Sequence, residues 1–374
     1  MFPKKIVHII EPTLQDETGH CCGYVTALLE ASATTDLQLE LWIGNKAKKL
    51  FANATRKHYF FIRQLRRLQI LFLYYYLLKK NAIIFVPTAG QIDLVFLNWL
   101  LKKNPQKNNN IFLHFHRYKT SDKKLLTLRQ IAENHQEFNI LAPTERLLSI
   151  FANIGFKKCH LVPCPTHTRP DIKLKASGKM KYLLYAGAAR QGKGLHLVVE
   201  LIQYLHKVQS EIPVVVQISP NYVGRYDEKT LEIVEKLKKC SYPFLKLYEV
   251  SLNKTEYLAL FEDAICLLLY DVGFYADHFS GVALDAFYAG CPILTTNGTW
   301  ISDMVGRFQA GAIVEDTQPD ALFKEIEKIS SSFQKLQQNA LHAGDVLRKE
   351  HDPHNTLAII SQEVKLQVDR KPII

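Results

Sequence analysis

The chain has 374 residues, of which 47% are hydrophobic and 22% are charged, and its formal net charge is +11. This length and apolar content favour two folded domains with buried cores, and they exclude a chain that is disordered throughout. The positive charge fits either general solubility or a partner that is an anionic ligand, a nucleic acid or an anionic membrane surface.

The seven cysteines have no spacing typical of a disulfide framework or a zinc site. Cys21 and Cys22 are adjacent, and the pair Cys159 and Cys164 has one histidine beside it, whereas a structural zinc site needs four well-spaced ligands. We therefore expect reduced cysteines in a cytoplasmic protein. Glu11 interrupts the first apolar run, and no run approaches the roughly 20 residues of a membrane-spanning helix, so we predict neither a secretion signal nor a spanning helix.

Short apolar runs alternate with segments of helical periodicity along the whole chain, which is typical of parallel sheets covered by helices. The predicted strands are 5–10, 37–43, 82–87, 111–116, 138–142, 182–186, 214–219, 245–250, 264–270, 292–296 and 311–314. The predicted helices are 23–32, 63–80, 92–103, 125–135, 195–206, 228–239, 255–262, 282–289, 319–347 and 354–371. Three prolines between 163 and 170 mark a join. We predict an α/β protein of two doubly wound domains facing a cleft, with ligands beyond the strand ends.

In the first half, two short segments after predicted strands are candidates for a site. The loop after the first strand contains Gly19 and His20, and a glycine there lets a ligand approach the backbone; a helix-capping turn is the alternative. The strand 111–116 ends in His114 and His116, which share a face because alternate strand residues do. Two such histidines could bind a metal, but no third ligand lies nearby in the sequence, so we predict no metal site.

Residues 46–80 hold at least ten lysines and arginines interleaved with phenylalanines and tyrosines. A basic, aromatic segment suits an anionic membrane surface, where each cation contributes on the order of 1 kcal/mol. The alternatives are a helix with one core-facing side and one solvated basic side, or nucleic acid. No RNA-binding motif or Cys/His finger accompanies the segment, so we predict no nucleic acid partner.

In the second half, the strand 182–186 runs into a loop with Gly187, Arg190 and Lys193, and a helix follows. Positive side chains on such a loop can hold a diphosphate, the arginine as a fork and the lysine as a point charge. An ordinary solvated turn is the alternative. The spacing is not that of a Walker A loop, which needs Gly-x4-Gly-Lys followed by Ser or Thr.

Two carboxylates, Asp277 and Asp285, stand eight residues apart in the segment that carries the most information. Between them lie Ser280, Gly281 and Val282, whose backbone N–H groups at a helix start suit a phosphate. A carboxylate at Asp285 can reach a ribose hydroxyl, or it can simply favour the helix dipole. Asp277 is either a sugar contact or a solvated loop residue, in which case Tyr275 is a candidate for the sugar.

The two second-half motifs, which begin 90 residues apart at Gly187 and Asp277, together resemble the donor signature of retaining GT-B glycosyltransferases, group 1 or family 4-like. That signature has glutamates at the two carboxylate positions. The resemblance implies that Asp285 binds the ribose and that Arg190 and Lys193 stabilise the departing diphosphate. It also implies that Gly19 lies under the transferring sugar, with His20 beside it.

The same resemblance implies that His116 contacts the sugar and that the chain has three parts. These are an N-terminal acceptor domain over 1–168, a C-terminal nucleotide-sugar donor domain over 169–350, and a last helix over 351–374 that packs back on the first domain.

The implied reaction moves a sugar from a UDP- or GDP-linked donor to a hydroxyl of a glycan, lipid-linked or protein acceptor. The resemblance implies retention of configuration and no metal or other cofactor, with a place in glycan, lipopolysaccharide or glycolipid synthesis and a cytoplasmic or peripheral membrane location. One alternative is a catalytically degenerate GT-B module that only binds, which the two Asp residues in place of Glu favour. The other is a nucleotide-sugar epimerase.

Overall fold

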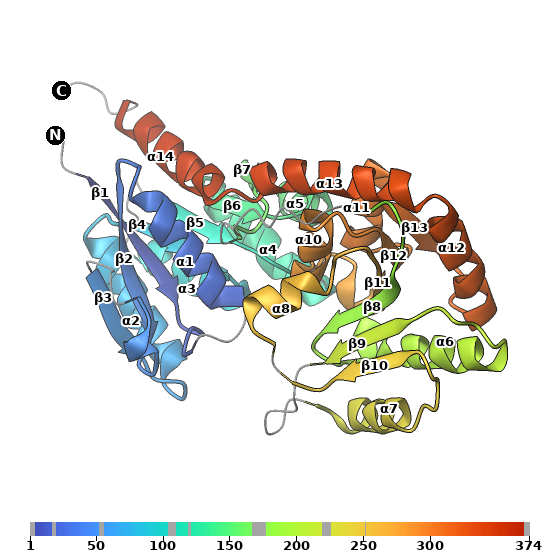
Figure 1. Ribbon diagram of the computed structural model, residues 1–374. Helices are drawn as coiled ribbons and strands as arrows, with labels where there is room; N and C mark the ends of the chain where they lie inside the picture. Colours follow the sequence, from blue (N-terminus) through green and yellow to red (C-terminus); the bar gives the residue numbers. More distant parts are fainter. Residues whose placement is uncertain are drawn as a thin grey trace. The chain divides into compact units, whose positions relative to one another are not determined.

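A computed structural model describes residues 4–16, 20–51, 56–103, 110–118, 121–166, 177–218, 226–250 and 252–369, except for the side chains of His20, Lys49 and 366–369. The chain divides into two compact units. The first comprises Met1–Thr168 with Glu350–Ile374, and the second comprises Arg169–Lys349 (Figure 1).

The first unit is built on a parallel sheet in the order β3-β2-β1-β4-β5-β6-β7. Its strands are β1 (Lys5–Glu11), β2 (Leu37–Gly44), β3 (Arg56–Phe61), β4 (Ile83–Val86), β5 (Ile111–His114), β6 (Asn139–Ala142) and β7 (Lys158–Leu161). Its helices are α1 (His20–Ser32), α2 (Arg66–Lys79), α3 (Gln91–Lys103), α4 (Asp122–Asn134), α5 (Glu145–Ile154) and α14 (Pro353–Asp369), with a short 3₁₀ turn η1 (Ala47–Lys49). The direction of strand addition reverses between β1 and β4, which pair in parallel.

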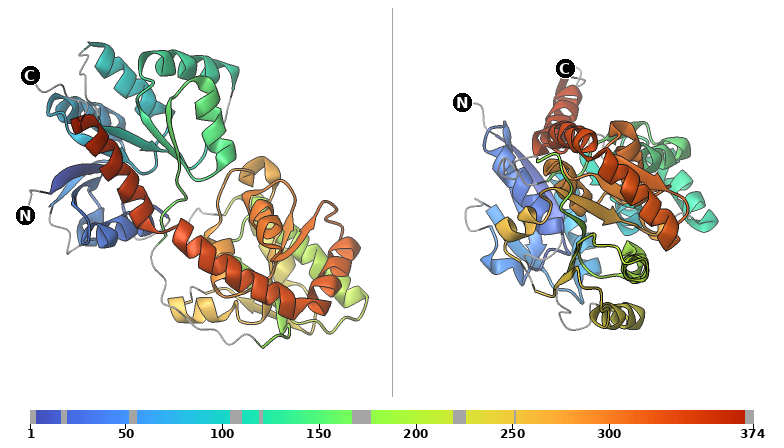
Figure 2. Two further views of the ribbon diagram at one scale, coloured as in Figure 1. Left: turned by 90° about the horizontal axis from the view of Figure 1, so that it is seen from above. Right: turned by 45° about the vertical axis from the view of Figure 1, so that its right-hand side comes forward.

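Helices cover both faces of this sheet, so its central strands are buried along their whole length, as β4, β5 and β6 are. One buried cluster joins the sheet to α2, α3, α4 and α5. The other joins it to α1 and to α14, which contributes Leu357, Ile360 and Val364. Figure 2 shows α14, in red, against the first unit, and Lys158 forms an ion pair of 2.8 Å with Glu363 of that helix.

The second unit repeats this plan with the sheet order β10-β9-β8-β11-β12-β13. Its strands are β8 (Tyr182–Gly187), β9 (Val214–Ile218), β10 (Leu245–Tyr248), β11 (Ala264–Leu268), β12 (Ile293–Thr296) and β13 (Gly311–Val314). Its helices are α6 (Leu195–Lys207), α7 (Glu228–Lys238), α8 (Lys254–Ala259), α9 (Val272–Tyr275), α10 (Gly281–Tyr288), α11 (Trp300–Phe308), α12 (Pro319–Ser331) and α13 (Phe333–Glu350), with a 3₁₀ turn η2 (Gln191–Lys193). Helices α6, α7 and α12 pack on one face, and α10, α11 and α13 pack on the other.

The predicted α/β class is confirmed, and three details of the prediction are wrong. The single helix predicted over 319–347 is two helices, because α12 ends at Ser331 in a run of weak helix formers and Ser332 separates it from α13. The strands predicted over 111–116, 245–250 and 264–270 end two residues earlier, at His114, Tyr248 and Leu268. Strands β3 and β7 and helix α11 were not predicted; β7, for example, is a partly exposed edge strand without an apolar run.

Candidate functional site

The loop that leaves β8 is shaped by glycines. Gly187 ends the strand with φ +113°, and its N–H donates to Oε1 of Gln217 on β9 at 2.9 Å. Gly194 begins α6 in the left-handed region at φ +74°, where a Cβ would overlap the carbonyl group of Leu269. Only glycine fits such a turn without strain. Arg190 and Lys193 are therefore carried on a tight turn at the point where strand addition reverses between β8 and β11.

The start of α10 offers backbone N–H groups toward open space. Ser280 caps the helix, because its hydroxyl accepts from the Ala283 N–H at 3.3 Å, and it lies 3.4 Å from the hydroxyl of Tyr270. Gly281 is exposed, and no heavy atom comes within 4 Å of the place where a Cβ would stand. An anion could thus approach the helix end, where the dipole and the free N–H groups favour negative charge.

The two sequence motifs meet in the structure although 90 residues separate their first members. A Cβ on Gly187 would lie 3.3 Å from Cγ2 of Val282, in the first turn of α10. The N–H of Asp271 donates to the carbonyl of Gly192 at 2.9 Å, and this bond joins the loop after β8 to the loop after β11. The structure therefore brings the cationic loop and the helix start to one edge of one sheet.

Tyrosine rings line the contact between these two loops. The ammonium of Lys193 lies 5.4 Å from the ring centre of Tyr270, within the range of a cation–π contact. The ring of Tyr275 lies 4.9 Å from that of Tyr270, and its Cε2 would be 3.3 Å from a Cβ on Gly192. Tyr275 thus packs against the backbone of the cationic loop.

The loop after β8 carries two positive charges, on Arg190 and Lys193. Arg190 is exposed and Lys193 is half-buried. Burial, with a further contribution from the charge of Arg190, lowers the pKa of Lys193 to about 8. Asp285 is 4% exposed in the second turn of α10, and Asp277 is half-buried in the turn between α9 and α10. Two cations beside a helix start can bind a doubly charged anion such as a diphosphate.

Among the predicted residues of the first unit, His116 lies at the carboxyl edge of the sheet. Gly19 falls outside the described residues, and His20 begins α1 with its side chain outside the description. His116 follows β5, and its ring centre lies 5.0 Å from that of His114 and 5.6 Å from that of Tyr24.

One buried carboxylate at this edge was not predicted as part of a site. Glu11 ends β1 without any exposure, and it accepts hydrogen bonds from the N–H of Thr13 at 3.2 Å and from the hydroxyl of Thr88 at 2.5 Å. Burial raises the pKa of this carboxyl group. The signal in the sequence is an acidic residue at the end of an apolar run, which by itself does not distinguish a site residue from the end of a strand.

Residues 169–343 match the family model described as glycosyl transferases group 1. The second unit therefore resembles the group 1 glycosyltransferases. The match spans nearly all of the second unit, the one that holds the cationic loop and the start of α10. It confirms the predicted enzyme class, a glycosyltransferase that uses a nucleotide sugar.

Solved structures resemble this glycosyltransferase over almost its whole length. A glycosyltransferase from Rickettsia africae has a TM-score of 0.74 at 13% identity, with 97% of this chain and 100% of that chain covered. A sucrose-phosphate synthase from Thermosynechococcus elongatus has a TM-score of 0.70 at 15% identity, with the same coverage. HepE from Anabaena, in complex with UDP-glucose, has a TM-score of 0.67 at 12% identity, with 96% and 99% covered. These likenesses confirm the predicted GT-B fold. Among curated protein sequences, none matches the chain.

Proposed function

We propose that the protein transfers a sugar from a nucleotide-sugar donor, held by its second unit, to an acceptor hydroxyl, with retention of configuration and without a metal. The observation that carries the proposal is the contact between the loop Gly187–Gly194 and the start of α10. It gathers two cations and free helix N–H groups at one sheet edge. A UDP-linked donor is the first candidate, because HepE is seen with UDP-glucose, with UDP, and with UDP and glucose.

The proposed roles follow from position and chemistry. Arg190 and Lys193 stabilise the charge that builds on the departing diphosphate, which preorganised cations can do without a metal. The N–H groups of Ser280, Gly281 and Val282 bind phosphate oxygens. The carboxylate of Asp285, one turn further along α10, accepts from a ribose hydroxyl, while Asp277 and Tyr275 are placed toward the sugar.

The first unit is proposed to receive the acceptor. Its sheet edge holds His116. In the resembled family, this residue and the ones that match Gly19 and His20 lie next to the transferring sugar. The proposed division is therefore an acceptor domain over 1–168, a donor domain over 169–350, and a final segment over 351–374 that belongs with the first. Contact with both substrates would orient the acceptor hydroxyl against the anomeric carbon and exclude water.

A thermal-shift screen of the purified protein against UDP, GDP, ADP and their sugars tests the donor site. A ligand that binds only the folded state raises the apparent stability, by about 2.7 kcal/mol at a concentration of 100 Kd. We expect a shift with one nucleotide class, and we expect the double variant Arg190→Ala, Lys193→Ala to lose it. Lys236→Ala, an exposed lysine on α7, is the matched control and should keep the shift.

Slow hydrolysis of the nucleotide sugar separates transfer from mere binding. An active enzyme should release the nucleoside diphosphate from its donor in the absence of acceptor, and the double variant should not. Binding of a nucleotide sugar without any hydrolysis or transfer would favour the degenerate GT-B module. Conversion to a second nucleotide sugar, with no free diphosphate, would favour an epimerase.

We further propose that α2 rests on an anionic membrane surface, where a lipid-linked acceptor would be found. Helix α2 buries Ile70, Leu73, Tyr74, Leu77 and Leu78 against the core of the first unit. Its other side, together with the preceding Leu65, exposes a stripe of large apolar and aromatic side chains. This α2 stripe consists of Leu65, Leu68, Phe72, Tyr75 and Tyr76, of which Phe72 is 67% exposed.

Cations frame the α2 stripe. Arg63, Arg66 and Arg67 stand at its amino end, and Lys79 and Lys80 stand at its carboxyl end over the rings of Tyr75 and Tyr76. An apolar stripe bordered by cations fits the headgroup region of an anionic bilayer. Among the described residues, no helix is long and apolar enough to cross a membrane. We propose a peripheral contact on the cytoplasmic side.

Vesicle sedimentation tests the membrane contact. We expect binding to vesicles with a third phosphatidylglycerol, weaker binding to pure phosphatidylcholine, and release by high salt. Phe72→Ser with Leu68→Ser should abolish binding, whereas the control Phe244→Ser, at an exposed position of the second unit, should not. If the α2 double variant and Phe244→Ser bound vesicles equally well, the α2 stripe would not be a membrane contact. The proposal for the donor site does not depend on this result.

A further inference from the structure

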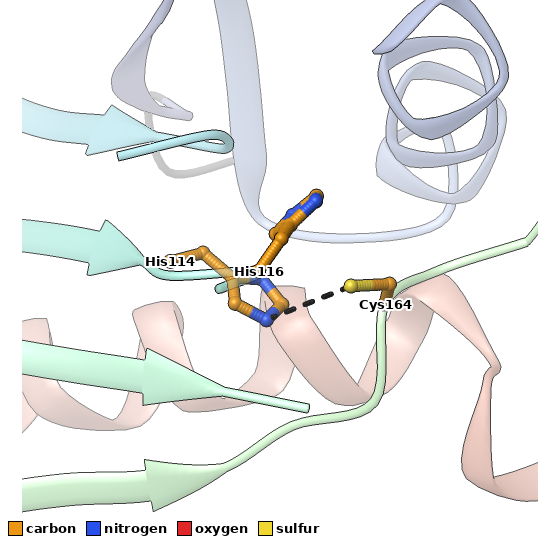
Figure 3. Close-up of side chains that lie close together, drawn as sticks. All are labelled: His114, His116 and Cys164. Atoms are coloured by element: carbon orange, nitrogen blue, oxygen red, sulfur yellow. Dashed lines mark hydrogen bonds between the residues drawn. The ribbon is translucent and has the colours of Figure 1, made fainter. Parts of the chain in front are cut away.

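Three metal-ligating side chains converge at the carboxyl edge of the first unit (Figure 3). Nε2 of His114, at the end of β5, lies 4.0 Å from Sγ of Cys164. One ligand atom each of His114, His116 and Cys164 falls within 4.8 Å of the others. Cys164 is 48 residues beyond His116 in the sequence, so it was not predicted as a third ligand beside the two histidines.

The order of the strands in the sheet explains why Cys164 lies beside the two histidines. β6 lies between β5 and β7, and after β7 the chain passes the end of β6, where the N–H of Val162 donates to the carbonyl of Ala142 at 2.9 Å. Figure 3 shows this segment rising toward the end of β5 with Cys164 on the side of His114. Cys164 and His114 are both buried, so the sulfur and the ring face each other away from solvent.

The first histidine is prepared to act as a ligand. Nδ1 lies 2.6 Å from the hydroxyl of Tyr24, and the ring also bonds the backbone of Val162. When Nδ1–H donates to the Tyr24 hydroxyl, Nε2 faces Cys164, and a cation bound at Nε2 takes the place of the ring's hydrogen bond to Val162. A hydrogen-bonded oxygen behind a metal-binding histidine is the usual arrangement that fixes its tautomer.

We propose that His114, His116 and Cys164 bind a thiophilic divalent cation of the Zn²⁺ class. Zinc prefers nitrogen and sulfur ligands, at about 2.0–2.1 Å and 2.3 Å, so neighbouring ligand atoms in a tetrahedral site are separated by roughly 3.3–3.7 Å. The present spacing of up to 4.8 Å therefore needs a contraction of about 1 Å. His116 can supply it, because it follows the end of β5 and is not held in the strand.

The binding step is balanced by one proton. Cys164 is buried, and it binds a metal as the thiolate. Binding forms a metal–sulfur bond, and the thiol proton leaves to solvent. Three protein ligands leave the fourth position open, so the site can be filled and emptied rather than serving as a closed structural centre.

The consequence for activity rests on the proposed function, in which His116 contacts the transferring sugar. A cation bound at this site holds the His116 ring toward Cys164 and away from the sugar. The inferred site is therefore an inhibitory one: the reaction runs without metal, and Zn²⁺ stops it reversibly.

Titration of the full-length, reduced protein with Co²⁺ tests the site without any assay of activity. We expect one thiolate-to-cobalt charge-transfer band per chain, displaced by Zn²⁺. Cys164→Ala should lose the band, and Cys159→Ala should keep it. Cys159 is the matched control because it lies in the same unit on β7, with its thiol bonded to the carbonyl of Phe156.

Two further measurements keep the inference testable. His116→Gln should weaken Co²⁺ binding at least tenfold, and this variant decides the matter if Cys164→Ala does not fold. A wild-type protein without the charge-transfer band, or a band that survives in Cys164→Ala, would overturn the site.

An activity assay then tests the inhibitory role separately. Donor hydrolysis or transfer by the wild type should fall at least tenfold with Zn²⁺ and return with a chelator, while Cys164→Ala should keep its basal rate and lose the zinc sensitivity. A cobalt site combined with a zinc-insensitive rate would overturn the inhibitory role alone. Absence of any donor turnover would count against the proposed function, and the cobalt band would still decide the metal site.

Discussion

Lys193 is the residue whose titration should be visible in function. Its pKa of about 8 means that the ammonium begins to lose its proton just above neutral pH. The charged form attracts a diphosphate, so affinity for UDP should be full near pH 6 and should fall as the pH rises through about 8. Isothermal titration calorimetry at a series of pH values would measure this change in UDP affinity. Arg190→Ala removes the neighbouring positive charge and should move the midpoint to higher pH; a flat profile would contradict the role of Lys193.

The same lysine should reduce the stability of the folded protein. Its pKa is about 8 when folded and 10.5 as the ordinary value. Between these two values the unfolded chain binds more protons, so this group makes the free energy of unfolding rise with pH across that window. Below pH 8 the half-buried charge is a cost. Lys193→Met should therefore gain on the order of 1 kcal/mol at pH 7, after allowance for solvent screening. Chemical denaturation measures this, with Lys236→Met expected within about 0.5 kcal/mol of the wild type.

At the scale of elements, the glycines at the starts of α6 and α10 have different roles: one permits a turn of the backbone, and the other leaves space for a ligand. Gly194 has a positive φ and no room for a Cβ beside the Leu269 carbonyl, whereas Gly281 stands in open space. Gly194→Ala should cost about 2 kcal/mol or more in the free energy of unfolding. Gly281→Ala should change stability by less than about 0.5 kcal/mol, yet it should weaken UDP binding because a methyl group would stand where the ligand approaches. A thermal melt and a UDP titration of both variants distinguish the two roles.

How far the sequence could predict these elements depends on whether a feature is local. Gly187, Lys193 and Ser280 were found because each stands at the end of an apolar run or the start of a helical one. β3 was missed because its residues Arg56–Phe61 are cationic and aromatic rather than alternating. Cys164 was missed as a partner of His114 because only the order β5-β6-β7 brings the two together, and strand order is not written in local periodicity.

At the scale of the whole molecule, the chain has separate cores. The buried clusters of the described residues each lie within one unit, and the first of these units is completed by the last helix. On α14, Leu357 and Ile360 are buried beside Leu28 of α1. The stability of the first unit therefore depends on residues more than 300 positions from its amino-terminal strands, while the second unit is continuous in sequence.

This division predicts that each ligand stabilises its own unit. UDP should raise the calorimetric transition of the second unit by mass action, and Zn²⁺ should raise that of the first. Core substitutions show which transition belongs to which unit. Leu357→Ala should lower the free energy of unfolding of the first unit by about 2–5 kcal/mol, and Ile326→Ala should lower that of the second unit by a similar amount. Scans of the full chain with UDP, with Zn²⁺ and with neither give the measurement. If Zn²⁺ raised the transition that Ile326→Ala lowers, the metal would be bound in the second unit, and His114, His116 and Cys164 would not be its ligands.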